Sequence, residues 1–491
     1  MKILTQIIRI LKPSEVRLIR SFYKVQPNGE VKRRLELFEL AKSGKASSDA
    51  EAAMAIYDGE PNSAFSHLKN RLQKDVLNIL LLKEGSKKYE TKYAQAIFDC
   101  RRMLIEGQIL FERGAYRAGE TVLQKAHDLA EEYELYAECV QINDLLRTNI
   151  GIRKGEAAYL SFEPKIADNV NKLQKYLSVK DSYNRFGVIS QFKKNFEKQS
   201  MAPLESALEE AGRYYKETDS ATIGYYYNYL GIFYGHFLGD YELAEKYAKD
   251  YLHLIEVSPA ISSNTRIASA NLQIASISIN KGDYDAAIEY ASIAKDRFIG
   301  GLFNELQAIE VQFVATFHNK DYKAAAEIAE IARQHPKFKA NKQIPAKWDY
   351  YKANLSFVNG NYNDAAVVLM KETELTKDKA GWLMGYRVLE LMCAVEQDDL
   401  DVFDYRSESF KKLLQRNKEE NVLRPRTALK ILGTYIKTGG DIKKTMVEEK
   451  NSIDLLREGK GKFTWDAMGF ELIRFDAWLD RLAKKKLKIR S

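Results

Sequence analysis

The sequence of 491 residues predicts an all-α protein, an α-solenoid of about nine stacked helical hairpins with a helical cap at each end. Two observations predict this fold class. A short turn signal followed by a helical pattern recurs along most of the chain. The composition also favours helix, because only 9 residues are proline while Ala, Leu, Glu and Lys are abundant. With 45% hydrophobic and 29% charged residues, the chain is expected to fold and to be soluble.

The recurring signal is a turn that ends in a tyrosine. Five copies are clear, with the tyrosine at Tyr116, Tyr241, Tyr284, Tyr322 and Tyr362. From Tyr241 onward the spacings are 43, 38 and 40 residues, and Leu400 and Ile442 continue the register after 38 and 42 more. The interval before Tyr241 has room for two weaker units near Ala157 and Ser200. A repeat of this length is typical of stacked helical hairpins.

One unit, residues 270–298, shows the physical basis of the repeat. Gly282 can adopt the left-handed conformation that ends a helix, and Asp283 can cap the helix that follows. The small Ala287 and Ala291 let the two helix backbones approach closely, while Tyr284 fills the space beside the turn. Because one hairpin cannot bury both of its faces alone, the unit must stack on neighbours of the same kind.

The signals around two of these turns resemble the tetratricopeptide repeat (TPR). In residues 229–252 the match is Leu230-Gly231-x-x-Tyr234, followed by Ala244 and Ala248; residues 106–126 carry Gly107, Gly114, Tyr116, Gly119, Leu123 and Ala126 at the family's spacing. The resemblance covers about residues 95–450. Because the periods exceed the family's value of about 34, we expect longer helices than in the simple repeat. Chains of this layout also resemble poorly characterised bacterial repeat proteins.

The resemblance implies a right-handed superhelix that acts as a non-enzymatic scaffold. In the family the first helix of each unit lines a concave face that binds peptides, so the expected partner is a protein or peptide. Carried over residue by residue, the expected contacts are Arg101, Gln108, Tyr225, Asn228, His236, Gln307, Glu310, Lys347, Tyr350 and Asn354. The tyrosine-rich stretch 224–237 surrounds one helix with rings, which either line this groove or fill gaps between repeats.

Residues 1–90 are expected to form a helical cap domain that precedes the repeat array of residues 91–455. Pro13 opens a helix that a turn at residues 26–29 ends. Residues 47–82 can then form a helix-turn-helix, with Ala55 as the small residue of the first helix and Gly59 at the turn. Phe65 and Leu68 would face the core, and the second helix would display Ser63, His67, Lys69, Asn70, Arg71 and Lys74.

The charge of this cap domain allows two interpretations. Residues 1–90 carry a net charge of +6, so Lys69, Asn70, Arg71 and Lys74 could contact nucleic acid. In that case the protein would be a transcriptional or nucleic-acid-associated regulator whose array senses a peptide or mediates dimerisation. The alternative, which we favour, is that these polar residues only form the outer face that a terminal repeat needs.

The C-terminal residues 456–491 are expected to form a capping helix with a basic tail. The apolar residues of the predicted amphipathic helix are Phe463, Met468, Phe470, Ile473, Phe475, Trp478 and Leu482. The cluster Lys484–Arg490 is expected to be a solvated tail, or else an electrostatic contact for RNA, an acidic protein or a membrane surface. Since residues 91–480 carry a net charge of about −4, the array itself is not basic.

No motif predicts catalysis, a cofactor or a metal site. The six histidines are scattered without a metal-ligand spacing. Residues 457–465 lack the full phosphate-loop spacing, and residues 397–406 lack the glycine and glutamate of a calcium loop. Three widely spaced cysteines are expected to be buried free thiols, which favours a cytoplasmic location. No apolar run is long enough to span a bilayer. We therefore expect a protein that is not an enzyme and needs no cofactor.

Overall fold

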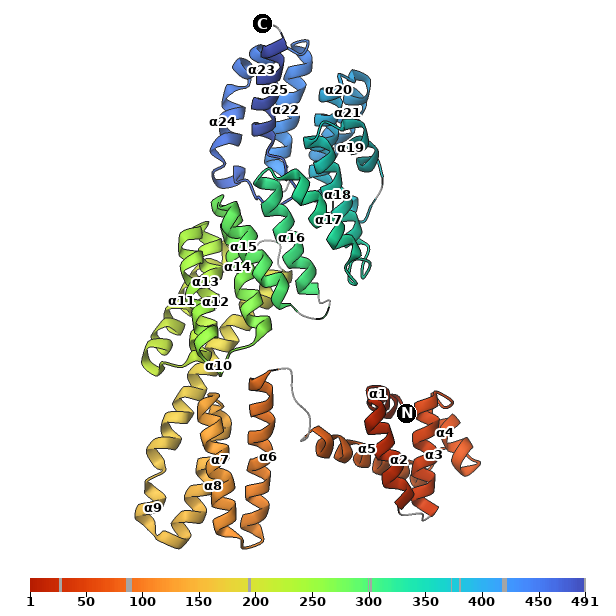
Figure 1. Cartoon of the computed structure of the whole chain (residues 1–491), viewed down its shortest axis with the longest axis vertical. Coiled ribbons are helices and arrows are strands. Elements are labelled where there is room, and N and C mark those ends of the chain that lie inside the picture. Colours follow the sequence, from red (N-terminus) through yellow and green to blue (C-terminus); the bar gives the residue numbers. More distant parts are fainter. Residues whose placement is uncertain are drawn as a thin grey trace. The chain divides into compact units, whose positions relative to one another are not determined.

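The computed structural model describes residues 1–25, 29–84, 91–192, 196–298, 300, 303–371, 373–378, 381–416 and 422–489. All the regular elements in these ranges are helices, which confirms the all-α prediction. The chain divides into two compact units, Met1–Val170 and Asn171–Ser491 (Figure 1). No helix in the described ranges is both long enough and apolar enough to cross a membrane.

The first unit begins with five helices that share one buried core. They are α1 (Lys2–Arg9), α2 (Pro13–Val25), α3 (Gly29–Ser43), α4 (Asp49–Tyr57) and α5 (Ser63–Glu84). Ile8, Leu37, Phe38, Phe65 and Leu72 lie in this core. Pro13 opens α2 as predicted. Of the expected turn at residues 26–29, residues 26–28 lie outside the described residues and Gly29 begins α3.

The rest of this unit is a second group of helices with a core of its own. These helices are α6 (Lys92–Glu112), α7 (Tyr116–Glu132), α8 (Tyr136–Lys154), the short α9 (Glu156–Leu160) and the start of α10 (Glu163–Phe192). Cys100, Leu123 and Ile142 are fully buried between them. Cys100 and Cys139 are buried free thiols, as predicted, and so is Cys393 of the second unit.

The second unit is a stack of helical hairpins (Figure 1). Its helices after α10 are α11 (Phe196–Thr218), α12 (Ala221–Leu238), α13 (Tyr241–Val257), α14 (Asn264–Lys281), α15 (Tyr284–Arg297), α16 (Phe303–His318), α17 (Tyr322–Gln334), α18 (Gln343–Val358), α19 (Tyr362–Leu369), α20 (Trp382–Gln397), α21 (Leu400–Arg416), α22 (Leu423–Lys437), α23 (Ile442–Glu448), α24 (Lys450–Glu458) and α25 (Phe475–Ile489). The 3-10 turns Leu375–Lys377 and Gly461–Phe463 also lie between them within the described ranges.

The predicted TPR-like hairpins are confirmed at each of the seven register positions. The first residues of α7, α13, α15, α17, α19, α21 and α23 are Tyr116, Tyr241, Tyr284, Tyr322, Tyr362, Leu400 and Ile442. In the unit analysed above, Gly282 ends α14 with φ at +82°. The Asp283 carboxylate accepts a hydrogen bond from the Ala286 amide at 3.2 Å, and so caps α15. Ala287 and Ala291 are fully buried between the helices.

The two weaker units differ from each other. Ala157 lies in α9, directly after Gly155 ends α8 with φ at +90°, so a turn is present there. Ser200 instead lies inside α11, and residues 193–195 before it lie outside the described residues. The handedness of the superhelix and the domain boundaries after residues 90 and 455 stay predictions.

The predicted C-terminal helix is wrong over residues 463–474, because α25 begins only at Phe475. Gly459 ends α24 with φ at +57°, and the chain then crosses the stack without forming an α-helix. The Asp466 carboxylate accepts a hydrogen bond from the Met468 amide at 2.9 Å, which favours a turn over a helix. We call residues 459–474 the strap.

Candidate peptide-binding face

The candidate site is one face formed by α16, α18 and α20, the first helices of three successive hairpins. Along each helix, this face presents residues that are three, four or eight positions apart: Gln307, Glu310 and His318, then Lys347, Tyr350 and Asn354, then Trp382, Gly385 and Leu389. We call these nine residues the array face. Its two halves differ, because one half is open and the strap covers the other.

The open half is a hollow of about 350 Å³. Gln307, Glu310, Lys347 and Trp382 line it, together with apolar side chains that include Leu306. Lys347 forms an ion pair with Glu310, and its ammonium lies 4.9 Å from the centre of the Trp382 ring. The hollow therefore combines apolar walls with one charge of each sign, a combination that can fix the orientation of an apolar side chain.

The closed half holds the strap through hydrogen bonds to its backbone. The Tyr350 hydroxyl donates to the Phe470 carbonyl at 2.6 Å, and His318 Nε2 donates to the Ala467 carbonyl at 3.0 Å. A Cβ atom on Gly385 would lie 2.4 Å from the Phe470 carbonyl oxygen, so only glycine lets the strap approach α20 this closely. Backbone hydrogen bonds of this kind are how proteins commonly hold extended segments.

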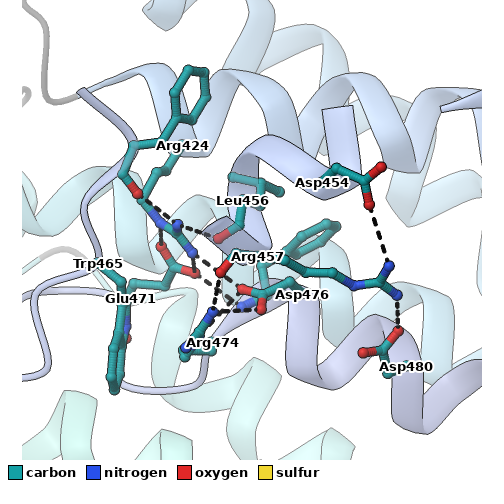
Figure 2. Close-up of polar contacts among 11 residues, drawn as sticks. Arg424, Asp454, Leu456, Arg457, Trp465, Glu471, Arg474, Asp476 and Asp480 are labelled. Atoms are coloured by element: carbon teal, nitrogen blue, oxygen red, sulfur yellow. Dashed lines mark hydrogen bonds and ion pairs between the residues drawn. The ribbon is translucent and has the colours of Figure 1, made fainter. Parts of the chain in front are cut away.

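Arg424 at the start of α22 fixes the end of the strap (Figure 2). Its Nε and Nη2 donate to the two oxygens of Glu471 at 2.6 and 2.8 Å, and Nη2 also donates to Asp476 at 3.3 Å. Nη1 donates to the carbonyls of Leu456 and Phe463 at 3.0 and 2.9 Å. Burial opposes the guanidinium charge, but these carboxylates outweigh it and raise the pKa of Arg424.

Glu471 also links the strap to α25. One carboxylate oxygen accepts a hydrogen bond from the Phe475 amide at 2.9 Å, in the first turn of that helix. The Glu471 carbonyl accepts one from the Trp465 indole at 2.9 Å. The Arg474 guanidinium lies 5.1 Å from the Trp465 ring and donates to Asp476 at 2.7 Å. The strap is thus a closely bonded part of the second unit.

The predicted solvated tail is partly bonded to the array. Lys485 donates to the Glu396 carboxylate of α20 at 2.9 Å, and the Trp478 indole donates to the other Glu396 oxygen at 2.9 Å. Glu396 has a side chain only 2% exposed. Burial alone would raise the pKa of this carboxyl, but the Lys485 and Trp478 hydrogen bonds lower it below its usual value. Of the basic cluster Lys484–Arg490, Arg490 lies outside the described residues.

We expect the second unit to lose stability as the pH falls below about 7, in part through His318. Burial lowers the pKa of this imidazole below its ordinary value of 6.5, so the unfolded chain binds the proton more readily than the folded one. The loss of stability begins near the pKa of His318 in the unfolded chain and levels off below its pKa in the folded chain. Its size is about 1.4 kcal/mol for each unit by which these two pKa values differ. Urea titrations between pH 5 and 8 measure it, and His318→Gln should flatten the profile. A variant with the profile of the wild type would contradict this role.

The predicted contact residues fall into different environments. Gln307, Glu310 and Lys347 meet in the open hollow. Tyr350 and Asn354 are on the same face but only 2% and 1% exposed, because the strap and its neighbours cover them. The remaining five lie elsewhere: Tyr225, Asn228 and His236 on α12, and Arg101 and Gln108 on α6 of the first unit.

The α12 residues belong mainly to packing between helices. Asn228 is 3% exposed, and Tyr225 is half-buried against Tyr226 and Tyr251, with ring centres 4.9 and 5.2 Å away. His236 is half-buried, and burial lowers its pKa. These contacts support the interpretation that the tyrosine-rich stretch fills gaps between the helices. On α6, Arg101 Nε donates to the Glu138 carboxylate at 2.8 Å, and Gln108 is exposed.

Sequence reasoning missed Trp382, Gly385 and Arg424. Gly385 lies 38 residues after Lys347, and Trp382 is three residues before Gly385, so extending the repeat by one unit would have placed both on the same face. The sequence indicates a buried role for Arg424 only weakly, through its place beside Pro425 among residues that pack into the core. Its partner Glu471 is 47 residues away along the chain, and no local pattern joins the two.

The predicted helix-turn-helix has its two helices, α4 and α5, and Phe65 and Leu68 are buried as expected. Ala55, the predicted small residue of the first helix, is exposed, while Ala52 and Ala53 are buried. Four residues were proposed to contact nucleic acid. Lys69 donates to Asp49 at 2.6 Å and Arg71 pairs with Glu30, whereas Asn70 and Lys74 are exposed.

Comparisons with known proteins add little to this picture. No family model matches the sequence, and neither does any curated protein. A solved structure that the chain is similar to is the crystal structure of the P58(IPK) TPR domain, with 13% sequence identity over 79% of this chain and 99% of that one and a TM-score of 0.21. A score this low carries no argument, so the TPR-like description rests on the hairpins themselves.

Proposed function

We propose that the protein is a non-enzymatic scaffold that binds a peptide or an extended protein segment at the open half of the array face. The observation that carries the proposal is the hollow lined by Gln307, Glu310, Lys347 and Trp382. This hollow lies directly beside the residues that hold the strap, since the Trp382 ring is 5.7 Å from the ring of Tyr350, which bonds to the strap. The same face thus already holds one segment of chain through hydrogen bonds to its backbone.

The lining indicates the chemistry of the segment that binds there. An apolar or aromatic side chain would fill the space between Leu306 and Trp382. A polar group of the same segment would bond to Glu310 or Lys347, which form an ion pair with each other in the hollow. Such a site suits a segment of mixed polarity and gives affinity from aromatic contacts and specificity from the charge pair.

Photo-crosslinking from within the hollow tests the proposal. With p-benzoylphenylalanine in place of Gln307, ultraviolet light in the native cells should join the full chain to a partner segment, which mass spectrometry identifies. A synthetic copy of that segment should then bind the purified protein. Lys347→Glu should weaken this binding at least tenfold, because it replaces the ion pair with Glu310 by repulsion.

Lys352→Glu is the matched control, because Lys352 lies on the same helix but is exposed and does not line the hollow. This variant should bind the segment as the wild type does. If Lys347→Glu and Lys352→Glu leave the affinity equal, the hollow is not the binding site.

The regulator hypothesis for residues 1–90 stays a prediction. Two of its four proposed contacts are paired with carboxylates of the same unit, which reduces the positive charge that a phosphate backbone would meet. A steeply salt-dependent binding of DNA by the full chain, lost on charge reversal of Lys74, would support it.

A further inference from the structure

A second hollow, away from the array face, opens between α19, α20 and α21. It has a volume of about 560 Å³. Helix α19 has only 8 residues, whereas α17 and α21 have 13 and 17, and the hollow reaches Met370 at the end of this short helix. The proposed peptide-binding function does not use these residues.

The wall of this hollow contains a carboxylate of which only one oxygen accepts a hydrogen bond. Glu390 is 5% exposed, and its Oε2 accepts a hydrogen bond from Arg387 at 2.5 Å. Its buried Oε1 has no hydrogen-bond partner among the described residues. An unpaired buried acceptor costs about 1–3 kcal/mol, so a donor that reached it would be bound favourably. Burial also raises the pKa of Glu390, since it disfavours the charged form.

The rest of the lining is apolar with an acidic rim. Val367, Met370 and Val402 are between 45% and 62% exposed, which is high for residues of this type. Asp399 and Asp401 stand on the rim. Among the described lining residues there are thus three carboxylates and one guanidinium, that of Arg406, which lies 5.6 Å from the Tyr405 ring.

We propose that this hollow binds a primary ammonium group on an apolar stem, with the ammonium bonded to Glu390 and the stem against Val367, Met370 and Val402. The three carboxylates outnumber the two guanidiniums beside them, those of Arg406 and of Arg387, which is paired with Glu390, so the hollow still favours a cation. The buried Oε1 of Glu390, at the wall of the hollow, supplies an acceptor for one N–H. The exposed aliphatic walls match a stem of several methylene groups. A lysine side chain of a partner protein and a free alkylamine share this chemistry.

A titration of the full chain with hexylammonium chloride tests the proposal. In protein labelled with ¹³C at its methionine methyl groups, the Met370 resonance should shift and saturate at millimolar concentrations, as expected for so small a ligand. Met370→Leu assigns the resonance. Hexanol, which has the stem but no charge, should shift it far less. Nα-acetyl-lysine amide distinguishes the two sources: a similar shift indicates a lysine side chain, and no shift indicates a free amine.

Glu390→Gln is the decisive variant, because it keeps the shape and removes the charge. It should bind hexylammonium at least tenfold more weakly while its melting temperature stays close to that of the wild type. Asp404→Asn, which changes an exposed carboxylate on α21 outside the hollow, should bind as the wild type does. An unshifted Met370 resonance, or equal affinities for Glu390→Gln and the wild type, would overturn the proposal.

Discussion

Arg424→Met should lower the unfolding free energy of the second unit by about 3–5 kcal/mol, because it leaves buried carboxylates without their cation. The Arg424 side chain is 8% exposed and donates five hydrogen bonds, two of them to Glu471 (Figure 2). Urea titration followed by tryptophan fluorescence measures the change. All four tryptophans of the chain lie in the second unit, so the signal reports on this unit alone.

Arg457→Met is the matched control for this variant. Arg457 pairs with Asp480 at 2.6 Å in the same region, but the two side chains are 40% and 41% exposed. Exposed pairs of this kind contribute about 0–1 kcal/mol. Adding Glu471→Leu to Arg424→Met should restore part of the lost stability, since it removes a buried carboxylate that no longer has its cation. Equal losses for Arg424→Met and Arg457→Met would show that the buried cluster does not hold the strap.

Gly385→Ala should destabilise the second unit by about 1–3 kcal/mol, although alanine is the better helix former. The added methyl group would lie 2.4 Å from the Phe470 carbonyl oxygen and 2.7 Å from the Tyr350 hydroxyl. Neither atom can move easily, because the two are hydrogen-bonded to each other and Tyr350 is only 2% exposed. The same urea titration gives the change in free energy.

Gly433→Ala supplies the comparison for this effect. Gly433 lies in α22, and a Cβ atom placed on it would meet nothing within 4 Å. This variant should therefore gain about 0.5–1 kcal/mol from helix propensity. If both alanine variants were stabilised alike, the strap would not lie against α20 as the structure has it.

The hairpins could be predicted from the sequence because their signals are local. A glycine such as Gly282 ends one helix, Asp283 caps the next, and Tyr284 starts it, all within three residues. Related signals recur at the other turns, where Lys320 or Asp398 can take the left-handed conformation in place of glycine, and every one of the seven register positions begins a helix. Three residues that the repeat assigned to one face, Gln307, Glu310 and Lys347, also line one hollow, and their role in binding stays a prediction.

The strap could not be predicted, because long-range contacts determine its path. Its apolar residues Phe470 and Ile473 have a spacing that also suits a helix, and so they predicted one. The bonds that draw residues 459–474 across the array come from Arg424, Tyr350 and His318, which lie between 39 and 149 residues away from their partners in the strap. For the same reason, the sequence of α18 alone does not indicate that Tyr350 and Asn354 are buried.

We expect that the strap stays bound to one half of the array face, so that on this face a partner can bind only at the hollow. Hydrogen exchange of the full chain tests this central claim most directly. In peptides from residues 465–475, the hydrogen-bonded amides of Gly469 and Phe475 should exchange as slowly as those of α18. Opening the strap to expose them breaks the buried bonds of Arg424, Tyr350 and His318. Exchange of these residues within seconds, while α18 stays protected, would contradict the account. The strap would then be a displaceable occupant, and the whole face would be open to partners.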